Sequence, residues 1–176
     1  MHITAANCIA DVSSLLTKMS TKTATDTETG TVFTIEPWQG GVVGGIVGGL
    51  AFGAMMSMMM TDVMQNAIPG MYGLGPEAGA IGWIFHMSHA AILGVVFAAI
   101  AAYSGIETME GVGRTAAAGL VYGAVLWLAL AVIVMPLWVG AMTPAEPPVP
   151  NVNVQSLIGH AVYGLLLGGV YAALVE

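Results

Sequence analysis

The fold is decided by an apolar, glycine-rich stretch near the N-terminus, GGVVGGIVGGLAFGAMMSMMM (residues 40–60). It holds no charged residue and belongs to an apolar run over about 40–64. About 20 apolar residues are enough for a helix to cross roughly 30 Å of hydrocarbon. Similar runs follow at about 80–103, 113–138 and 154–175. The sequence therefore predicts an all-α membrane protein, a transmembrane bundle of four helices.

The overall composition excludes an ordinary water-soluble domain. Of 176 residues, 57% are hydrophobic and 7% charged, whereas soluble domains carry about 25% charged residues. Mean hydropathy is +0.84. The net charge is −7 with three Lys and Arg in all, so no nucleic-acid partner is expected. The acidic balance suits a very salty environment, and the lone Cys8 excludes an internal disulfide framework.

Two regions are expected along the chain. Residues 1–37 are polar and are predicted to form a disordered tail, and residues 38–176 form the four-span membrane domain. Lys18 and Lys22 precede the first span, and Arg114 lies between the second and third. Because basic residues favour the cytoplasmic side, we expect a multi-pass protein of the cell membrane with both termini in the cytoplasm.

The chain repeats itself at a distance of about 70 residues. HMSHAAILGVVFAAI (86–100) matches HAVYGLLLGGVYAAL (160–174), and LAFGA (50–54) matches LVYGA (120–124). Two spans per repeat preserve orientation, so the halves are expected to be parallel repeats related by a pseudo-two-fold axis along the membrane normal. The predicted repeats cover about 40–103 and 113–175.

Glycines recur every four residues within the spans. Small residues at this spacing allow two helix backbones to approach closely in lipid. We interpret them as packing seams; a pore lined by glycine backbone is the alternative. The glycines concerned are Gly41, Gly45, Gly49 and Gly53 in the first span, Gly94 in the second, Gly119 and Gly123 in the third, and Gly164 and Gly168 in the fourth.

Three histidines lie within the second and fourth spans. His86 and His160 occupy equivalent positions in the two repeats, within two turns of the outer surface, and His89 lies three residues after His86. An ionisable side chain in a span is a candidate for function. A neutral imidazole can instead donate to a backbone carbonyl and hold two helices together. A sharper hypothesis is a b-type haem with His86 and His160 on either side of its iron.

Two further hypotheses concern the outer end of the first span. Met60 and Met64 bear thioethers, which favour Cu(I), and Asp62 is a weaker candidate ligand beside them. Methionine is also a common filler of gaps between helices. Asp62 and the histidines also suggest a proton relay near the outer surface.

Two motifs connect the chain with a known family. Gly-Trp-x-x-His spans Gly82–His86, and His-x-x-x-Gly-x-x-x-Gly spans His160–Gly168. Over about residues 40–175 the chain resembles an uncharacterised family of small four-span membrane proteins, common in haloarchaea and often mislabelled as histidine kinases. The resemblance implies the fold and no activity. A P-loop, a GxSxG elbow, an HExxH and a CxxC motif are missing from the sequence, and we assign no catalytic residue.

These observations favour a non-catalytic subunit of a larger membrane complex. A respiratory, terminal-oxidase-like complex is the most plausible setting, with haem b as a candidate cofactor and copper as a weaker one. The expected partners are the lipid bilayer and other membrane subunits, or further copies of the chain. The alternative is an independent small transporter, channel or proton-handling protein.

Overall fold

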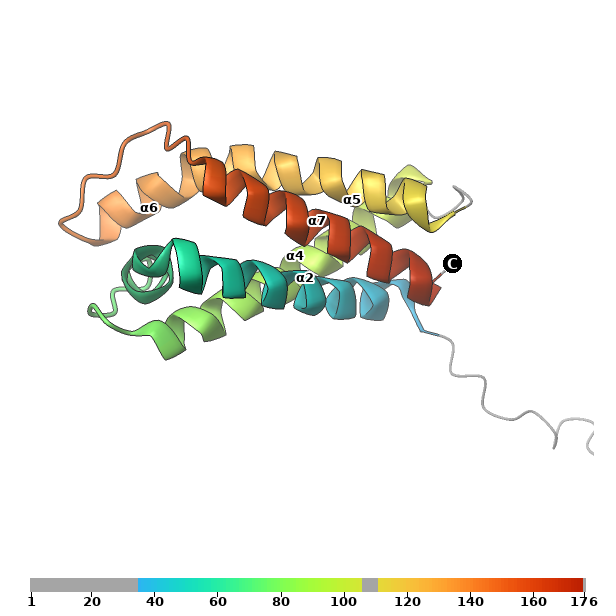
Figure 1. Cartoon of the computed structure of the whole chain (residues 1–176), viewed down its shortest axis with the longest axis horizontal. Helices are drawn as coiled ribbons and strands as arrows, with labels where there is room; N and C mark the ends of the chain where they lie inside the picture. Colours follow the sequence, from blue (N-terminus) through green and yellow to red (C-terminus); the bar gives the residue numbers. More distant parts are fainter. Residues whose placement is uncertain (1–34, 106–110, 176) are drawn as a thin grey trace, which may run out of the picture. The chain divides into compact units, whose positions relative to one another are not determined.

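The computed structural model describes residues 35–105 and 111–175. These residues form helices and connecting turns and contain no strand. Four helical stretches are long and apolar enough to cross a membrane, which confirms the prediction of an all-α protein with four candidate spans (Figure 1). They are α2 (Pro37–Met59), α4 (Gly79–Ser104), a third span over Val112–Met142, and α7 (Val154–Val175). The tail prediction for residues 1–34, Lys18 and Lys22 included, lies outside the described residues.

The first span is shorter than predicted. Its helix starts with a reciprocal cap in which the Glu36 backbone N–H donates to Oε1 of Gln39 at 2.9 Å. It ends at Met59, because Met60 leaves the helical conformation with φ −140° and ψ 48°. The chain then continues in two short segments, η1 (Val63–Ala67) and α3 (Ile68–Gly70). Asp62 and Met64 therefore lie beyond the membrane helix in which the sequence analysis placed them.

The third span is longer than predicted and changes its winding along the way. It consists of α5 (Val112–Leu126), the π-helical segment η3 (Trp127–Val134) and α6 (Met135–Met142). Pro136 lies in the first turn of α6, directly after the π-helical segment. Proline lacks the N–H that continues an α-helix. The helix nevertheless continues beyond the predicted end at 138.

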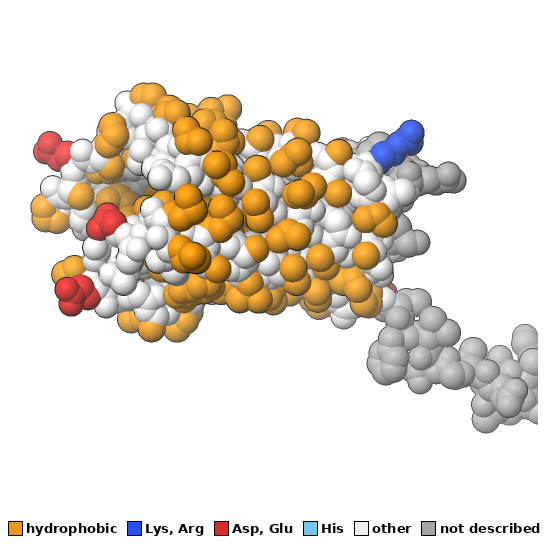
Figure 2. Space-filling view, viewed as in Figure 1, with side chains coloured by type: hydrophobic (Ala, Val, Ile, Leu, Met, Phe, Trp, Pro, Cys, Tyr) orange, Lys and Arg blue, Asp and Glu red, His pale blue; other side chains and the backbone are white. Residues whose placement is uncertain are grey.

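The helices pack in the order α4, α2, α7 and α5. Helix α2 packs along both α4 and α7, and α5 packs along α7. Figure 2 shows a surface of apolar and uncharged atoms between two ends that carry the charged side chains. We call the end formed by residues 60–78 and 143–153 the loop end. The opposite end holds the start of α2, the end of α7 and the exposed Arg114.

The paired glycines of α2 serve two neighbouring helices. A Cβ on Gly41 or Gly45 would overlap a backbone oxygen of α4, while a Cβ on Gly44 or Gly48 would overlap a backbone oxygen of α7. The second glycine of each pair thus faces α4, and the first faces α7. The doublets at 40–41, 44–45 and 48–49 arise because α2 approaches two backbones at once.

The same close approach occurs between α5 and α7. A Cβ on Gly119 would overlap the backbone oxygen of Gly164, and one on Gly123 would overlap that of His160. On the matching side of α7, a Cβ on Gly168 would overlap the backbone oxygen of Thr115. In the other pair, Gly94 meets the backbone of Gly41 in this way. Both helix pairs are therefore joined backbone to backbone.

Candidate functional site

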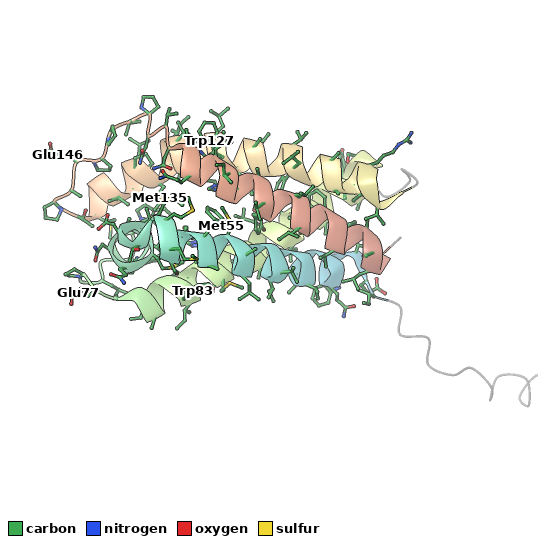
Figure 3. The ribbon with its side chains drawn as sticks, viewed as in Figure 1. Met55, Glu77, Trp83, Trp127, Met135 and Glu146 are labelled. Carbon is green, nitrogen blue, oxygen red and sulfur yellow. The ribbon has the colours of Figure 1, made fainter. Side chains whose placement is uncertain are left out.

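A cavity of about 370 Å³ lies toward the loop end, bordered by α2, α4, α7 and the third span. Apolar side chains form most of its wall, as is usual for sites that bind small molecules. Figure 3 shows Met135 of α6 pointing from the third span toward α2, and this residue belongs to the wall. The polar members of the wall include His86, His89, Ser156, His160 and Tyr163.

Two apolar side chains of the cavity wall are exposed on the surface, one from α4 and one from the third span: Ile92 is 61% exposed and Val134 is 42% exposed. The same two helices are linked by Tyr122, whose hydroxyl donates to the backbone oxygen of Leu93 at 2.8 Å. Near the loop end, the Tyr72 and Trp138 rings lie 5.5 Å apart.

The imidazole of His86 joins α4 to α2. Its Nε2 donates to the backbone oxygen of Gly49 at 2.9 Å, and the residue is 8% exposed. Because a carbonyl oxygen only accepts, Nε2 carries the proton in the neutral ring and Nδ1 keeps its lone pair. This is the helix-joining contact that the sequence analysis weighed against cofactor binding.

The imidazole of His160 is held within its own helix. Its Nδ1 donates to the backbone oxygen of Ser156, one turn earlier, at 2.8 Å. The lone pair of His160 therefore lies on Nε2. Although the two histidines occupy equivalent positions in the sequence, they use opposite ring nitrogens as donors.

Both lone-pair nitrogens are accessible. Among the described residues, every buried side-chain nitrogen or oxygen has a hydrogen-bond partner. The bonds of the two rings run through Nε2 of His86 and Nδ1 of His160, so the remaining nitrogens lie on accessible surface. Both residues line the cavity. Two of the residues in its wall thus carry an accessible ring nitrogen that can accept a hydrogen bond or bind a metal.

Phe52 contacts both imidazoles. Its ring centroid is 5.5 Å from that of His86 and 4.7 Å from that of His160, in edge-on contacts. Two imidazoles that share one haem iron must direct a nitrogen each at a single atom. Nε2 of His86 is bonded to the backbone oxygen of Gly49 and Nδ1 of His160 to that of Ser156. In this arrangement, an iron held by both rings would have to be bound through Nδ1 of His86 and Nε2 of His160.

His89 lies on the cavity wall but is bonded toward the loop end. Its Nε2 shares a hydrogen bond with the Tyr72 hydroxyl. The Tyr72 ring stacks on Phe85 with centroids 4.0 Å apart. This contact fixes the turn at residues 71–73 over α4.

The residues of the copper hypothesis lie apart. Met60 lines the cavity, whereas Met64 is buried with its backbone oxygen against Gly82. Asp62 is exposed and accepts a hydrogen bond from Nδ2 of Asn66 at 2.7 Å. Within 35–105 and 111–175, no group of three His, Cys, Asp or Glu side chains is placed to hold a metal ion.

Sequence reasoning missed the aromatic residues of the site. Tyr163 is buried, and its hydroxyl donates to the backbone oxygen of Ala90 at 2.7 Å. Phe52 and Tyr122 occupy the same place in the matching segments LAFGA and LVYGA. The aromatic residue at the same position of both matching segments could have indicated that Phe52 and Tyr122 matter to the site.

Replacing Tyr163 by Phe is expected to lower the free energy of unfolding by about 0.6 kcal/mol, and by no more than about 1.7 kcal/mol, the range for hydrogen bonds between membrane helices. The variant keeps the ring and loses the bond to Ala90. Equilibrium unfolding in detergent micelles measures the change. The control is Tyr103→Phe, at a residue 96% exposed, and an equal loss in both variants would contradict the assignment.

Four apolar spans with charged side chains at the two ends define a multi-pass integral membrane protein. The chain belongs to DUF6789, a family of unknown function, whose sequence model matches residues 35–176. No curated protein and no solved structure matches the chain. The match confirms the expected membership in an uncharacterised family and adds no activity.

Proposed function

We propose that this protein is a small, non-catalytic subunit of a larger membrane complex and that its cavity holds a lipid-soluble ligand there. The observation that carries the proposal is the largely apolar cavity, whose wall includes Ile92 and Val134, two apolar side chains that are exposed on the surface of α4 and of the third span. Three histidines supply polar groups in its wall. Ligand sites commonly combine an apolar wall with a few placed polar groups.

The surface of the third span supports association within the bilayer. Only 22% of its most apolar window is buried, compared with 39% for α2 and for α7. It therefore has the most free apolar surface of the four spans, for lipid, another subunit or a second copy of the chain. A respiratory, terminal-oxidase-like complex remains the specific setting that we propose from the sequence.

The helix contacts also support the proposed parallel repeats. In each proposed repeat, glycines of the first helix meet the backbone of the second, as Gly41 meets Gly94 and Gly119 meets Gly164. With four spans, the start of α2 and the end of α7 share a side. The positive-inside rule makes that side cytoplasmic in our proposal, with Arg114 on it.

Mild detergent extraction followed by native electrophoresis and mass spectrometry tests the subunit proposal. We expect the full chain to migrate with other membrane subunits, redox proteins among them. Migration as a monomer or small homo-oligomer without such partners would contradict it.

Haem is left out of the proposal because Nε2 of His86 is already bonded to the backbone oxygen of Gly49. We expect the purified chain to show no Soret band in either the oxidised or the reduced state. Absorption spectroscopy after supply of haem during expression tests this. A Soret band that is lost in both His86→Ala and His160→Ala would restore the haem hypothesis.

The transporter alternative finds less support in the helix packing. Tyr122 and Leu93 join the third span to α4, and the glycine seams bring helix backbones together. A solute route along the bundle would have to separate these helices. Uptake of ions or small solutes by liposomes that contain the purified protein would support the transporter alternative against the subunit proposal.

A further inference from the structure

We propose that the cavity binds an uncharged lipid with a hydroxyl head group, such as a long-chain alcohol or a monoacylglycerol. The inference rests on the proposed function in using the same cavity, and it names the class of ligand. It follows from three features of the cavity wall: the lack of charged side chains, the mixture of hydrogen-bond donors and acceptors, and the anchoring of the polar segment.

The cavity wall carries no charge of its own. Among the described residues, no Lys, Arg, Asp or Glu belongs to it. Most of the wall is apolar, and four thioethers contribute to it, those of Met56, Met60, Met71 and Met135. A charged head group that entered this cavity would lose its hydration without gaining an ion pair, which is costly. The ligand is therefore expected to be uncharged.

The polar side chains of the wall include both donors and acceptors. Asn151 and Asn153 bring side-chain amides, whose nitrogens donate. His86 and His160 each keep a ring nitrogen that accepts, because the opposite nitrogen donates to a backbone oxygen. A hydrocarbon would leave these groups without a partner. A hydroxyl can both donate and accept without carrying a charge, so it matches the mixed set.

The polar segment that precedes α7 is anchored to the third span. The backbone oxygen of Val132 lies four residues before Pro136, which has no N–H to offer it. The N–H of Asn151 donates to this oxygen at 2.9 Å. Close by in the sequence, Nε1 of Trp127 donates to the backbone oxygen of Asn153 at 3.3 Å. These bonds fix the two asparagines beside the π-helical segment before any ligand binds.

The size of the cavity favours a small ligand. Its volume of about 370 Å³ is at the lower end of the range of about 300–1,000 Å³ for ligand sites. A single hydrocarbon chain with a small head group suits this volume better than a lipid with two chains.

Photolabelling of the full chain in lipid nanodiscs tests the inference. The probe is a ten-carbon alcohol with a diazirine in its tail, and mass spectrometry locates the labelled residues. Met56 and Leu126 line the cavity and are only 4% and 8% exposed, so a label there reports on the interior. Val121 and Val125 of α5 are 64% and 56% exposed and lie outside the wall, so they report on the surrounding lipid. We expect labelling to saturate at the first pair and to rise in proportion to the probe at the second. Proportional labelling at both pairs would overturn the proposal.

Unlabelled competitors with the same ten-carbon chain identify the head group. At equal mole fractions in the lipid, we expect decanol to displace the probe from Met56 and Leu126 at least about tenfold more effectively than decane, as one or two hydrogen bonds imply. Decyl sulfate should be weaker than decanol by at least the same factor, because its charge loses hydration. Monodecanoylglycerol distinguishes a glycerol head group from a simple alcohol. Equal competition by decanol, decane and decyl sulfate would refute the assigned class.

A matched pair of variants locates the site. Ala131 and Ala129 both belong to η3, but Ala131 lines the cavity and Ala129 is exposed and lies outside its wall. We expect Ala131→Phe to reduce saturable labelling at least about tenfold by filling the space, while Ala129→Phe leaves it unchanged. Equal effects of the two variants would contradict binding in this cavity.

Asn151→Leu provides a readout that does not depend on filling the cavity. It removes the side-chain amide and keeps the backbone N–H that donates to Val132. The preference for decanol over decane should fall several-fold, as the loss of one hydrogen bond implies. Gln155→Leu, at an exposed residue outside the wall, is the control. An unchanged preference in Asn151→Leu, or an equal fall in both variants, would overturn the role of this amide.

The two proposals fail in different ways. Selective competition by decanol in a chain that migrates alone in native electrophoresis would refute the subunit proposal and leave this inference intact. Migration with partners and no preference among the competitors would do the reverse.

Discussion

Gly119→Val is expected to separate α5 from α7 and to lower the free energy of unfolding by about 3 kcal/mol or more, at or above the usual cost of overpacking. A Cβ at this position overlaps the backbone oxygen of Gly164 and presses on Gly168. Backbone atoms cannot rotate away as a flexible side chain can, so the helices must move apart. Reversible unfolding of the purified protein in mixed micelles measures the loss.

Gly113→Val is the matched control for this change. Gly113 belongs to the same helix, and a Cβ there meets nothing within 4 Å. Its substitution should change stability by less than about 0.5 kcal/mol, as is usual at surface positions. Equal destabilisation by both variants would show that valine weakens α5 itself, and the close approach of α5 to α7 would then not be the cause.

Gly159→Ala is expected to lower the free energy of unfolding by about 2 kcal/mol, within the usual cost of inserting a methyl group into a packed site. The Cβ would overlap the ring of Phe52, which already contacts both imidazoles. Here the obstacle is a side chain, so a second substitution should relieve it. In the double variant Gly159→Ala with Phe52→Ala, part of the loss should be recovered, with a coupling energy of about 1 kcal/mol or more.

The single variants and the double variant together form the test. If the losses from Gly159→Ala and Phe52→Ala simply add, the ring of Phe52 does not occupy the space above Gly159.

The helices and their seams were predictable because both depend on local pattern. Four apolar runs of sufficient length indicate four spans whatever lies beside them. Glycines every four residues mark a helix face, so the contacts of Gly45 and Gly119 with neighbouring backbones follow from spacing alone. The end of α2 at Met59 did not follow, because an apolar run contains no signal for the break at Met60.

The site was only partly predictable because its chemistry depends on contacts between helices. The positions of His86 and His160 follow from the repeat. The nitrogen that each donates is fixed by Gly49 in one case and by Ser156 in the other. The contact of Phe52 with both rings depends on how α2 meets α4 and α7. Neither fact can be read from one helix at a time.

The double glycine face of α2 makes the length of this helix unusually constrained. Adding or removing one residue turns everything beyond it by about 100°, given 3.6 residues per turn. In α2 that rotation would misalign the contacts with α4 and α7 together. In α5, whose glycines meet α7, it would misalign one seam. Insertions and deletions among relatives of this chain should therefore gather in the loops and at the ends of the third span, and should avoid residues 40–53.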